Sequence, residues 1–166
     1  MAVATEKTEA EKREELMKIV KGSRTAFFVT EAAGVLHGRP MANADVEQDI
    51  GTIWFASRRD SGKIAEIRQD QHVLLGYTNA SGSEWASVNG TATLVEDRAK
   101  VKELWNAFWK NWFDGPDDPN ILLIRVTPRS AEYWDSGSQA ITLIKFALAS
   151  VTGKKFDDGV NERVGF

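Results

Sequence analysis

The chain has 166 residues, a formal net charge of −3 at pH 7 and 42% hydrophobic residues, so it is long enough for one domain with a sizeable core. The acidic balance argues against a broad nucleic-acid surface. With no cysteine and only two histidines, His37 and His72, the sequence excludes disulfides and Cys-ligated metals, and we predict no metal site. The N-terminal residues lack the apolar core of a signal peptide and no apolar run approaches ~18 residues. We therefore predict a cytoplasmic protein without membrane contact.

The first predicted element is a helix over residues 5–21. Thr8 can cap its start, and Glu11 stands three residues later, as a capping box requires. Apolar residues form a short stripe near its end, and Gly22 is expected to terminate it. This pattern predicts an N-terminal helix docked on the body of the protein.

Strand patterns follow from Arg24 onward. The segments 25–30 and 35–43 flank EAAG and predict a hairpin, and Pro40 places the second strand at a sheet edge because proline has no N–H to donate. A strand over residues 52–57, a polar turn and a short helix over 64–70 come next. The strand pattern resumes at 73–79.

The clearest alternation lies in residues 85–95. The positions that share its apolar face are Ala86, Val88, Ala92 and Leu94. Gly90 interrupts this strand and predicts a bulge or a close backbone approach.

An aromatic-rich helix is predicted from Asp97 to Phe113, where Trp and Phe recur at helical spacing. Such a stripe is more typical of a core or a dimer interface than of a ligand site. A central strand follows over 121–128 and continues extended to Trp134. The segment 141–151 fits a helix or a strand, and its helical face favours the helix.

These elements predict a mainly β (α+β) fold with five or six strands and three helices. Because no βαβ alternation dominates, a small antiparallel barrel is the economical arrangement. We expect residues 1–153 to form a single domain and residues 154–166 a partly disordered tail.

The strongest chemical signal is the polar turn after residue 57. Ser57, Ser61, Gly62 and Lys63 place hydroxyls, a permissive backbone and a cation at a helix start, an arrangement that favours phosphate. The alternative is a solvated turn with surface bases. Arg39, beside Pro40, suits a phosphate or a carbonyl, or is a surface residue of an edge strand. No Ser–His–Asp arrangement is recognisable, so any enzymatic chemistry requires a cofactor.

Four segments in this order, GRPMAN, IWFAS with SGK, WASVNGTATLV and RVTPRSAEYW, resemble the pyridoxamine 5′-phosphate oxidase-like split-barrel flavoproteins. The branch they resemble is the general stress protein 26 type. The resemblance runs from about Arg24 to Gly153. It implies a six-stranded antiparallel split β-barrel with flanking helices that forms a homodimer, with FMN in a groove at the subunit interface.

The resemblance also implies cofactor-binding residues. Those matching the strand along the flavin ring and ribityl chain are Arg39, Pro40, Met41 and Ala42. Ala56 and Ser57 match the next strand, and Ser61 and Lys63 match the phosphate-binding turn. Trp85 lies where the oxidases carry a flavin-contacting Gln, and Trp134 matches an aromatic residue that reaches the flavin from the facing subunit.

Two departures argue against the vitamin B6 oxidase reaction. The region around Ala140–Thr142 has neither the Arg nor the His that holds pyridoxal phosphate in the oxidases, and Ala44 replaces an oxidase Lys. We expect an FMN-binding protein of the general stress type that acts as a flavin-dependent oxidoreductase, with NAD(P)H as a candidate partner. The alternatives are a non-enzymatic FMN binder in a stress response and a split barrel that binds haem or F420.

Overall fold

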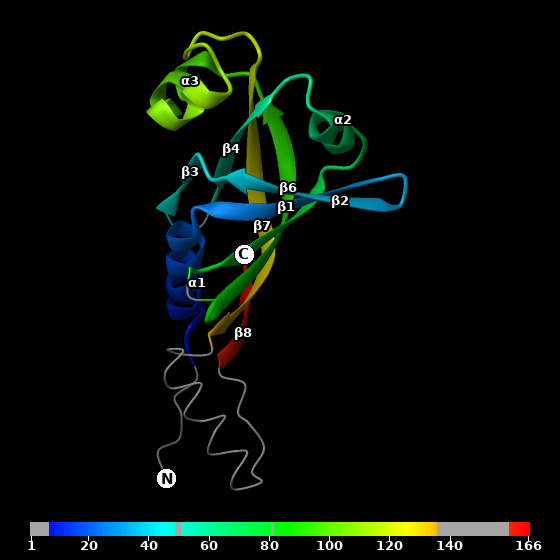
Figure 1. The fold of residues 1–166 in the computed structure, drawn as a ribbon. Helices are drawn as coiled ribbons and strands as arrows, with labels where there is room; N and C mark the ends of the chain where they lie inside the picture. Colours follow the sequence, from blue (N-terminus) through cyan, green and yellow to red (C-terminus); the bar gives the residue numbers. More distant parts are fainter. Residues whose placement is uncertain (1–6, 49–50, 81, 136–159) are drawn as a thin grey trace, which may run out of the picture.

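The computed structural model describes residues 7–48, 51–80, 82–135 and 160–166, drawn in Figure 1. Its strands form one antiparallel sheet in the order β2-β1-β5-β6-β7-β4-β3, and β8 also pairs with β7. The strands are β1 (Thr25–Ala32), β2 (Val35–Ala42), β3 (Asp45–Val46), β4 (Ile53–Arg58), β5 (His72–Thr78), β6 (Glu84–Val95), β7 (Ile121–Asp135) and β8 (Val160–Gly165). The helices are α1 (Glu9–Ser23), α2 (Gly62–Gln69), α3 (Arg98–Leu104) and the 3₁₀ helix η2 (Ala107–Asn111).

The two end strands of the sheet, β2 and β3, are consecutive in the chain, so the sheet curves round until its ends lie near each other. β2 ends at Ala42 and β3 begins at Asp45, and the Ala44 N–H donates to the Trp54 carbonyl of β4 at 2.7 Å. Farther along, no pairing joins β2 to β4 among the described strands, so the wall opens there. The predicted antiparallel α+β barrel is confirmed, although eight strands replace six because a two-residue β3 and the C-terminal β8 are added.

Helix α1 begins with the predicted capping box, since the Thr8 hydroxyl accepts from the Glu11 N–H and the Glu11 carboxylate accepts from the Thr8 N–H. It buries Leu16, Ile19 and Val20 in the core. The helix continues past Gly22 and ends at Ser23, with Arg24 in the left-handed region at φ 57°.

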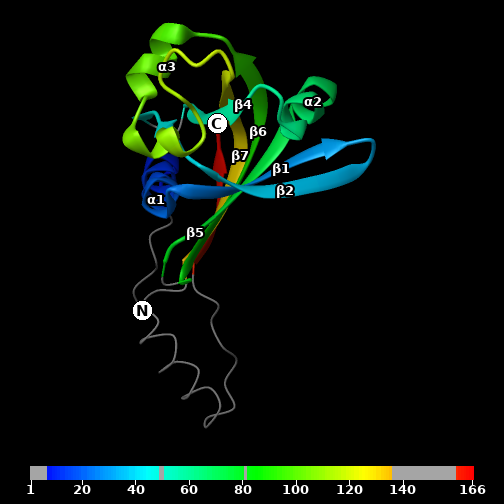
Figure 2. The same ribbon diagram turned by 45° about the horizontal axis from the view of Figure 1, so that its top comes forward.

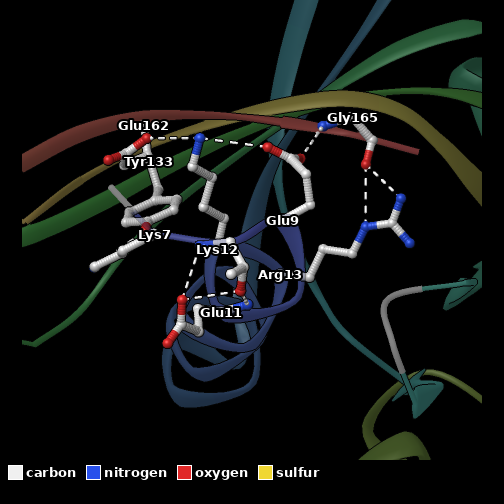
Figure 3. Close-up of polar contacts among 9 residues, drawn as sticks. Lys7, Glu9, Glu11, Lys12, Arg13, Tyr133, Glu162 and Gly165 are labelled. Carbon is white, nitrogen blue, oxygen red and sulfur yellow. Dashed lines mark hydrogen bonds and ion pairs between the residues drawn. The ribbon is translucent and has the colours of Figure 1, made fainter. Parts of the chain in front are cut away.

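The helix α1 also holds the C-terminal strand, as Figure 3 shows. Lys12 Nζ lies 3.1 Å from the Glu162 carboxylate, and Arg13 Nη2 donates to the Gly165 carbonyl at 2.6 Å. These contacts join the N-terminal helix to the C-terminal strand, so the two ends of the described chain are held together. Although we expect a partly disordered tail, its residues 160–165 form β8.

Local turn signals are confirmed where the sequence places them. Ala33 (φ 51°) and Gly34 (φ 77°) make the tight hairpin turn between β1 and β2, and Figure 2 shows this hairpin projecting from the sheet. Pro40 lies on the edge strand β2. The β6–β7 register shifts at Asn89/Gly90, and a Cβ on Gly90 would lie 2.8 Å from the Thr127 carbonyl oxygen. Only glycine allows that backbone approach.

The predicted single helix from Asp97 to Phe113 is wrong. Asp97 does cap α3, but this helix ends at Leu104 because Trp105 turns extended (ψ 131°). Asn106 then starts η2, with its side chain accepting from the Phe108 N–H. The predicted helix over 141–151 lies outside the described residues. Within the described part of the chain, no helix is both long and apolar enough to cross a membrane.

Candidate functional site

A cavity of about 260 Å³ lies in the opening between β2 and β4, beside the start of α2. One wall comes from the strands and the α2 turn, and the other comes from aromatic side chains in and around η2. The lining residues are Pro40, Met41, Ala42, Ala56, Ser57, Arg58, Ser61, Lys63, Phe108, Trp109, Trp112 and Phe113.

Lys63 is the partly buried cation of this cavity. Its Nζ donates to Ser61 Oγ at 2.6 Å and to Ser57 Oγ at 3.1 Å, which leaves one of its three N–H groups for another acceptor. Lys63 forms no ion pair with any residue that the structure describes. Burial lowers the pKa of Lys63, Arg39 lowers it further, and Glu66 acts in the opposite direction. The site therefore holds a cation whose charge would be stabilised by an incoming anion.

Arg39, the neighbouring cation, is already neutralised. Its Nη2 lies 2.6 Å from the Glu66 carboxylate, and its Nη1 lies 2.6 Å from the Thr30 hydroxyl, which also donates to Glu66 at 2.5 Å. Burial acts to raise the pKa of Glu66, but hydrogen bonds from Thr30 and Arg39 outweigh it and lower that pKa. This triad ties β2 and β1 to α2, the helix that carries Lys63.

The aromatic wall has a buried and an exposed layer. Trp109 and Phe113 are buried against Trp54, with Val101, Ile121 and Leu123 in the same cluster. Phe108 and Trp112 form an edge-on pair with ring centroids 4.8 Å apart, and they remain 55% and 51% exposed. The stripe predicted as core or interface thus divides into packing residues and exposed rings that border the cavity.

The structure brings seven of the ten predicted cofactor residues to this cavity: Pro40, Met41, Ala42, Ala56, Ser57, Ser61 and Lys63. Arg39 lies with Glu66 instead. Trp85 and Trp134 face each other across β6 and β7 at the far end of these strands. Trp134 follows Leu123, the partner of Ala56, by 11 residues, or roughly 36 Å along an extended strand. One chain therefore does not bring these tryptophans to the cavity.

Sequence reasoning did not assign five of the lining residues to this site: Arg58, Phe108, Trp109, Trp112 and Phe113. Arg58 forms an ion pair with Asp60, in which Arg58 Nη2 and the Asp60 carboxylate oxygen are 3.0 Å apart. The aromatic residues could have been suspected from the sequence, because together they are too bulky for one face of a single helix. No feature of the sequence indicates the break in the helix at Trp105, which brings these residues to the cavity.

Comparison with known proteins identifies the family. Residues 11–157 match the sequence profile described as pyridoxamine 5′-phosphate oxidase like. The chain belongs to this family. The chain is 33% identical over 131 residues to Protein bli-3 of Neurospora crassa, a match that covers 73% of this chain and 63% of that protein. The chain thus spans less than two thirds of the length of this relative.

Solved structures of family members share the fold. General Stress Protein 26 from Bacillus anthracis has a TM-score of 0.66 and 27% identity, covering 74% of this chain and 92% of that one. The general stress FMN/FAD binding protein from Xanthomonas citri has a TM-score of 0.68 and 30% identity, with coverage of 76% and 90%. These relatives confirm the predicted general stress protein 26 branch of the pyridoxamine 5′-phosphate oxidase-like family.

Proposed function

We propose that this family member is an FMN-binding flavoprotein of the general stress type that works as a homodimer. One observation carries the proposal: Lys63, without an ion pair among the described residues, is held by two hydroxyls in a cavity lined by residues expected to bind FMN. A relative with 30% identity is named for FMN and FAD binding. The proposal takes FMN as the cofactor because a single terminal phosphate matches one partly buried cation.

The residues of the cavity fit this cofactor by their chemistry. Lys63 and Ser61 would hold the phosphate, and Ser57 accepts a hydrogen bond from the ammonium and helps to position it. Pro40, on an edge strand, and Ala56 give a wall of small side chains along which a flat ring can lie. When bound, flavin supplies the electron-transfer chemistry that the side chains lack. The chain's own residues bind, orient and partly shield it.

The homodimer is supported by apolar side chains left exposed on one face of the sheet. Phe27 is 57% exposed on β1, and Trp85 is 52% exposed on β6. Large exposed apolar side chains on a sheet commonly mark an interaction surface. Since one chain keeps Trp85 and Trp134 away from its own cavity, contact between these tryptophans and FMN requires a second copy.

Several finer expectations remain proposals. We propose a flavin-dependent oxidoreductase with NAD(P)H as a candidate electron donor, located in the cytoplasm. The single domain expected over residues 1–153 would also include β8, which pairs with β7 of the same sheet. The vitamin B6 oxidase reaction is not proposed, because Ala44 and the sequence around Ala140–Thr142 depart from the oxidases. The alternative, a non-enzymatic FMN-binding protein, would use the same cofactor site and would differ only in showing no catalytic turnover.

The absorption spectrum of the purified protein tests the proposal. We expect a flavin spectrum, and we expect FMN itself to be released on denaturation. Titration of the flavin-stripped protein should show tighter binding of FMN than of riboflavin, since only FMN carries the phosphate for Lys63. A haem Soret band, or equal affinity for the two flavins, would contradict the proposal. NADPH oxidation by the FMN-loaded protein then separates an enzyme from a binder.

A further inference from the structure

A second cavity, of about 770 Å³, adjoins the first on the opposite side of the aromatic wall. Ala42, Phe108 and Trp109 line both cavities, so the two share a wall. The other lining residues of the second cavity are Lys21, Arg24, Thr25, Asn43, Asp45, Val46 and Asn106. Neither the sequence motifs nor the flavin site accounts for this cavity.

The two cavities lie at opposite ends of the opening between β2 and β4. Arg39 binds Glu66 of α2, so the α2 turn with Lys63 lies at the Arg39 end of the opening. The Ala44 N–H donates to the Trp54 carbonyl, which fixes the other end, and the second cavity begins there. A flavin with its phosphate on Lys63 would extend along Pro40–Ala42 toward the shared wall. The second cavity therefore borders the end of the site that is remote from the phosphate.

Two exposed cations line this second cavity and have no ion pair with any described residue: Lys21 and Arg24. They are not needed to cover the end of α1. The Ser23 hydroxyl donates to the Ile19 carbonyl at 2.7 Å, and the Asn43 amide donates to the Val20 carbonyl at 3.2 Å. Asn43 also donates its backbone N–H to the Arg24 carbonyl at 2.8 Å.

Two further details favour an anionic ligand in this cavity. Arg24 adopts a left-handed conformation (φ 57°), which glycine tolerates better than arginine, so the backbone conformation does not itself call for an arginine here. Asp45 is the acidic residue of the lining, and one of its carboxylate oxygens accepts from the Val46 N–H at 2.9 Å. The lining thus carries two cations against one carboxylate.

We propose that the second cavity binds a phosphorylated nucleotide that serves as co-substrate of the flavin site, with Lys21 and Arg24 holding its phosphates. The nucleotide's ring would lie against the shared wall of Ala42, Phe108 and Trp109. The role of the nucleotide as a co-substrate rests on the proposed function, but binding of the nucleotide can be tested without flavin.

Isothermal titration with NADP⁺ tests the site, on both flavin-stripped and FMN-loaded protein. The test variant is Lys21→Gln/Arg24→Gly, since glycine accepts the left-handed backbone and keeps the cap intact. We expect NADP⁺ affinity to fall about tenfold or more, because two charged hydrogen-bond partners are lost. We also expect wild-type affinity to fall with rising salt. Thermal unfolding should show that the variant remains folded.

The matched control is Lys18→Gln, a cation one turn earlier on α1 that pairs with Glu14 and Glu15 and lines neither cavity. It should bind NADP⁺ like the wild type. Equal NADP⁺ affinity in the double variant, no NADP⁺ binding to the wild type, or inorganic phosphate binding as tightly as NADP⁺ would each overturn the nucleotide site. If NADP⁺ binds through Lys21 and Arg24 but FMN does not bind, the flavin proposal fails and the nucleotide site stands.

Discussion

Two cations meet where β2 passes the start of α2, and they differ in how their charge is balanced. Arg39 is paired with the Glu66 carboxylate and shares the Thr30 hydroxyl with it. Lys63 is held only by the hydroxyls of Ser57 and Ser61. A cation whose charge is neutralised within the chain fixes the relative position of its elements. A partly buried cation held by neutral groups remains available for an anion.

The largest effect is expected from Arg39→Met, which leaves the Glu66 carboxylate without its cation. Because both side chains are mostly buried, with 23% and 17% exposure, we expect the free energy of unfolding to fall by about 2–3 kcal/mol. Urea denaturation measures this change. The double variant Arg39→Met/Glu66→Leu should regain much of the loss, since no charge is then left unpaired. Wild-type stability in Arg39→Met would contradict the structural role of the pair.

Lys63→Met should affect binding instead of stability. Loss of a charged hydrogen-bond partner is expected to weaken FMN binding by about 1.5–3 kcal/mol. The unfolding free energy should change little, because the loss of the hydrogen bonds to Ser57 and Ser61 is offset by no longer burying a charge. Flavin fluorescence titration measures the affinity. Riboflavin, which has no phosphate, serves as the control ligand and should bind both proteins equally. An unchanged FMN affinity would show that Lys63 does not bind the phosphate of FMN.

The pH dependence of FMN affinity should separate the two cations further. Burial lowers the pKa of Lys63 in the free protein, and a bound phosphate would raise it again. FMN affinity is therefore expected to be highest below the lowered pKa of Lys63 and to fall as pH rises through that pKa. Titrations across the alkaline range check this. Lys63→Met should show a flatter profile, and identical profiles would contradict the assignment.

The Arg39–Glu66 pair should show its own pH dependence at acid pH. The pKa of Glu66 is lowered in the folded protein from the usual 4.5, so its contribution to stability is present above pH 4.5 and is lost as pH falls through the lowered pKa. Urea midpoints measured at several pH values below 4.5 should therefore fall more steeply for the wild type than for Glu66→Gln. Parallel slopes would exclude this pair as a source of acid sensitivity.

The smallest effect is expected from Asp60→Asn, which releases Arg58 at the rim of the cavity. The Arg58–Asp60 pair is exposed, so its loss should leave stability unchanged within error. FMN affinity should rise slightly, because a further cation becomes free to face the phosphate. Fluorescence titration at low salt checks this. A large loss of stability would show that exposed and buried pairs do not differ here.

Local chemistry was predictable from the sequence. The capping box of Thr8 and Glu11, the bulge at Gly90 and the edge position of Pro40 depend on residues close in the chain or on a single backbone property. The polar turn was also recognisable from the sequence as a candidate phosphate site, because Ser61 and Lys63 are only two residues apart. Of the residues expected at the flavin, those on β2, β4 and this turn do meet in one cavity, except Arg39.

Residue patterns along the chain were enough to predict the class of fold, the strands that line the cavity and two candidate cations for an anion, Arg39 and Lys63. Which of these two cations lacks a carboxylate partner became apparent only from the packing. Arg39 and Glu66 are 27 residues apart, and no local pattern indicates that they pair. Likewise, the break at Trp105 that brings Phe108 and Trp112 to the cavity, and the second cavity beside Arg24, arise when distant segments pack together. Residue type fixes the chemistry that is available, whereas packing decides which charges are neutralised.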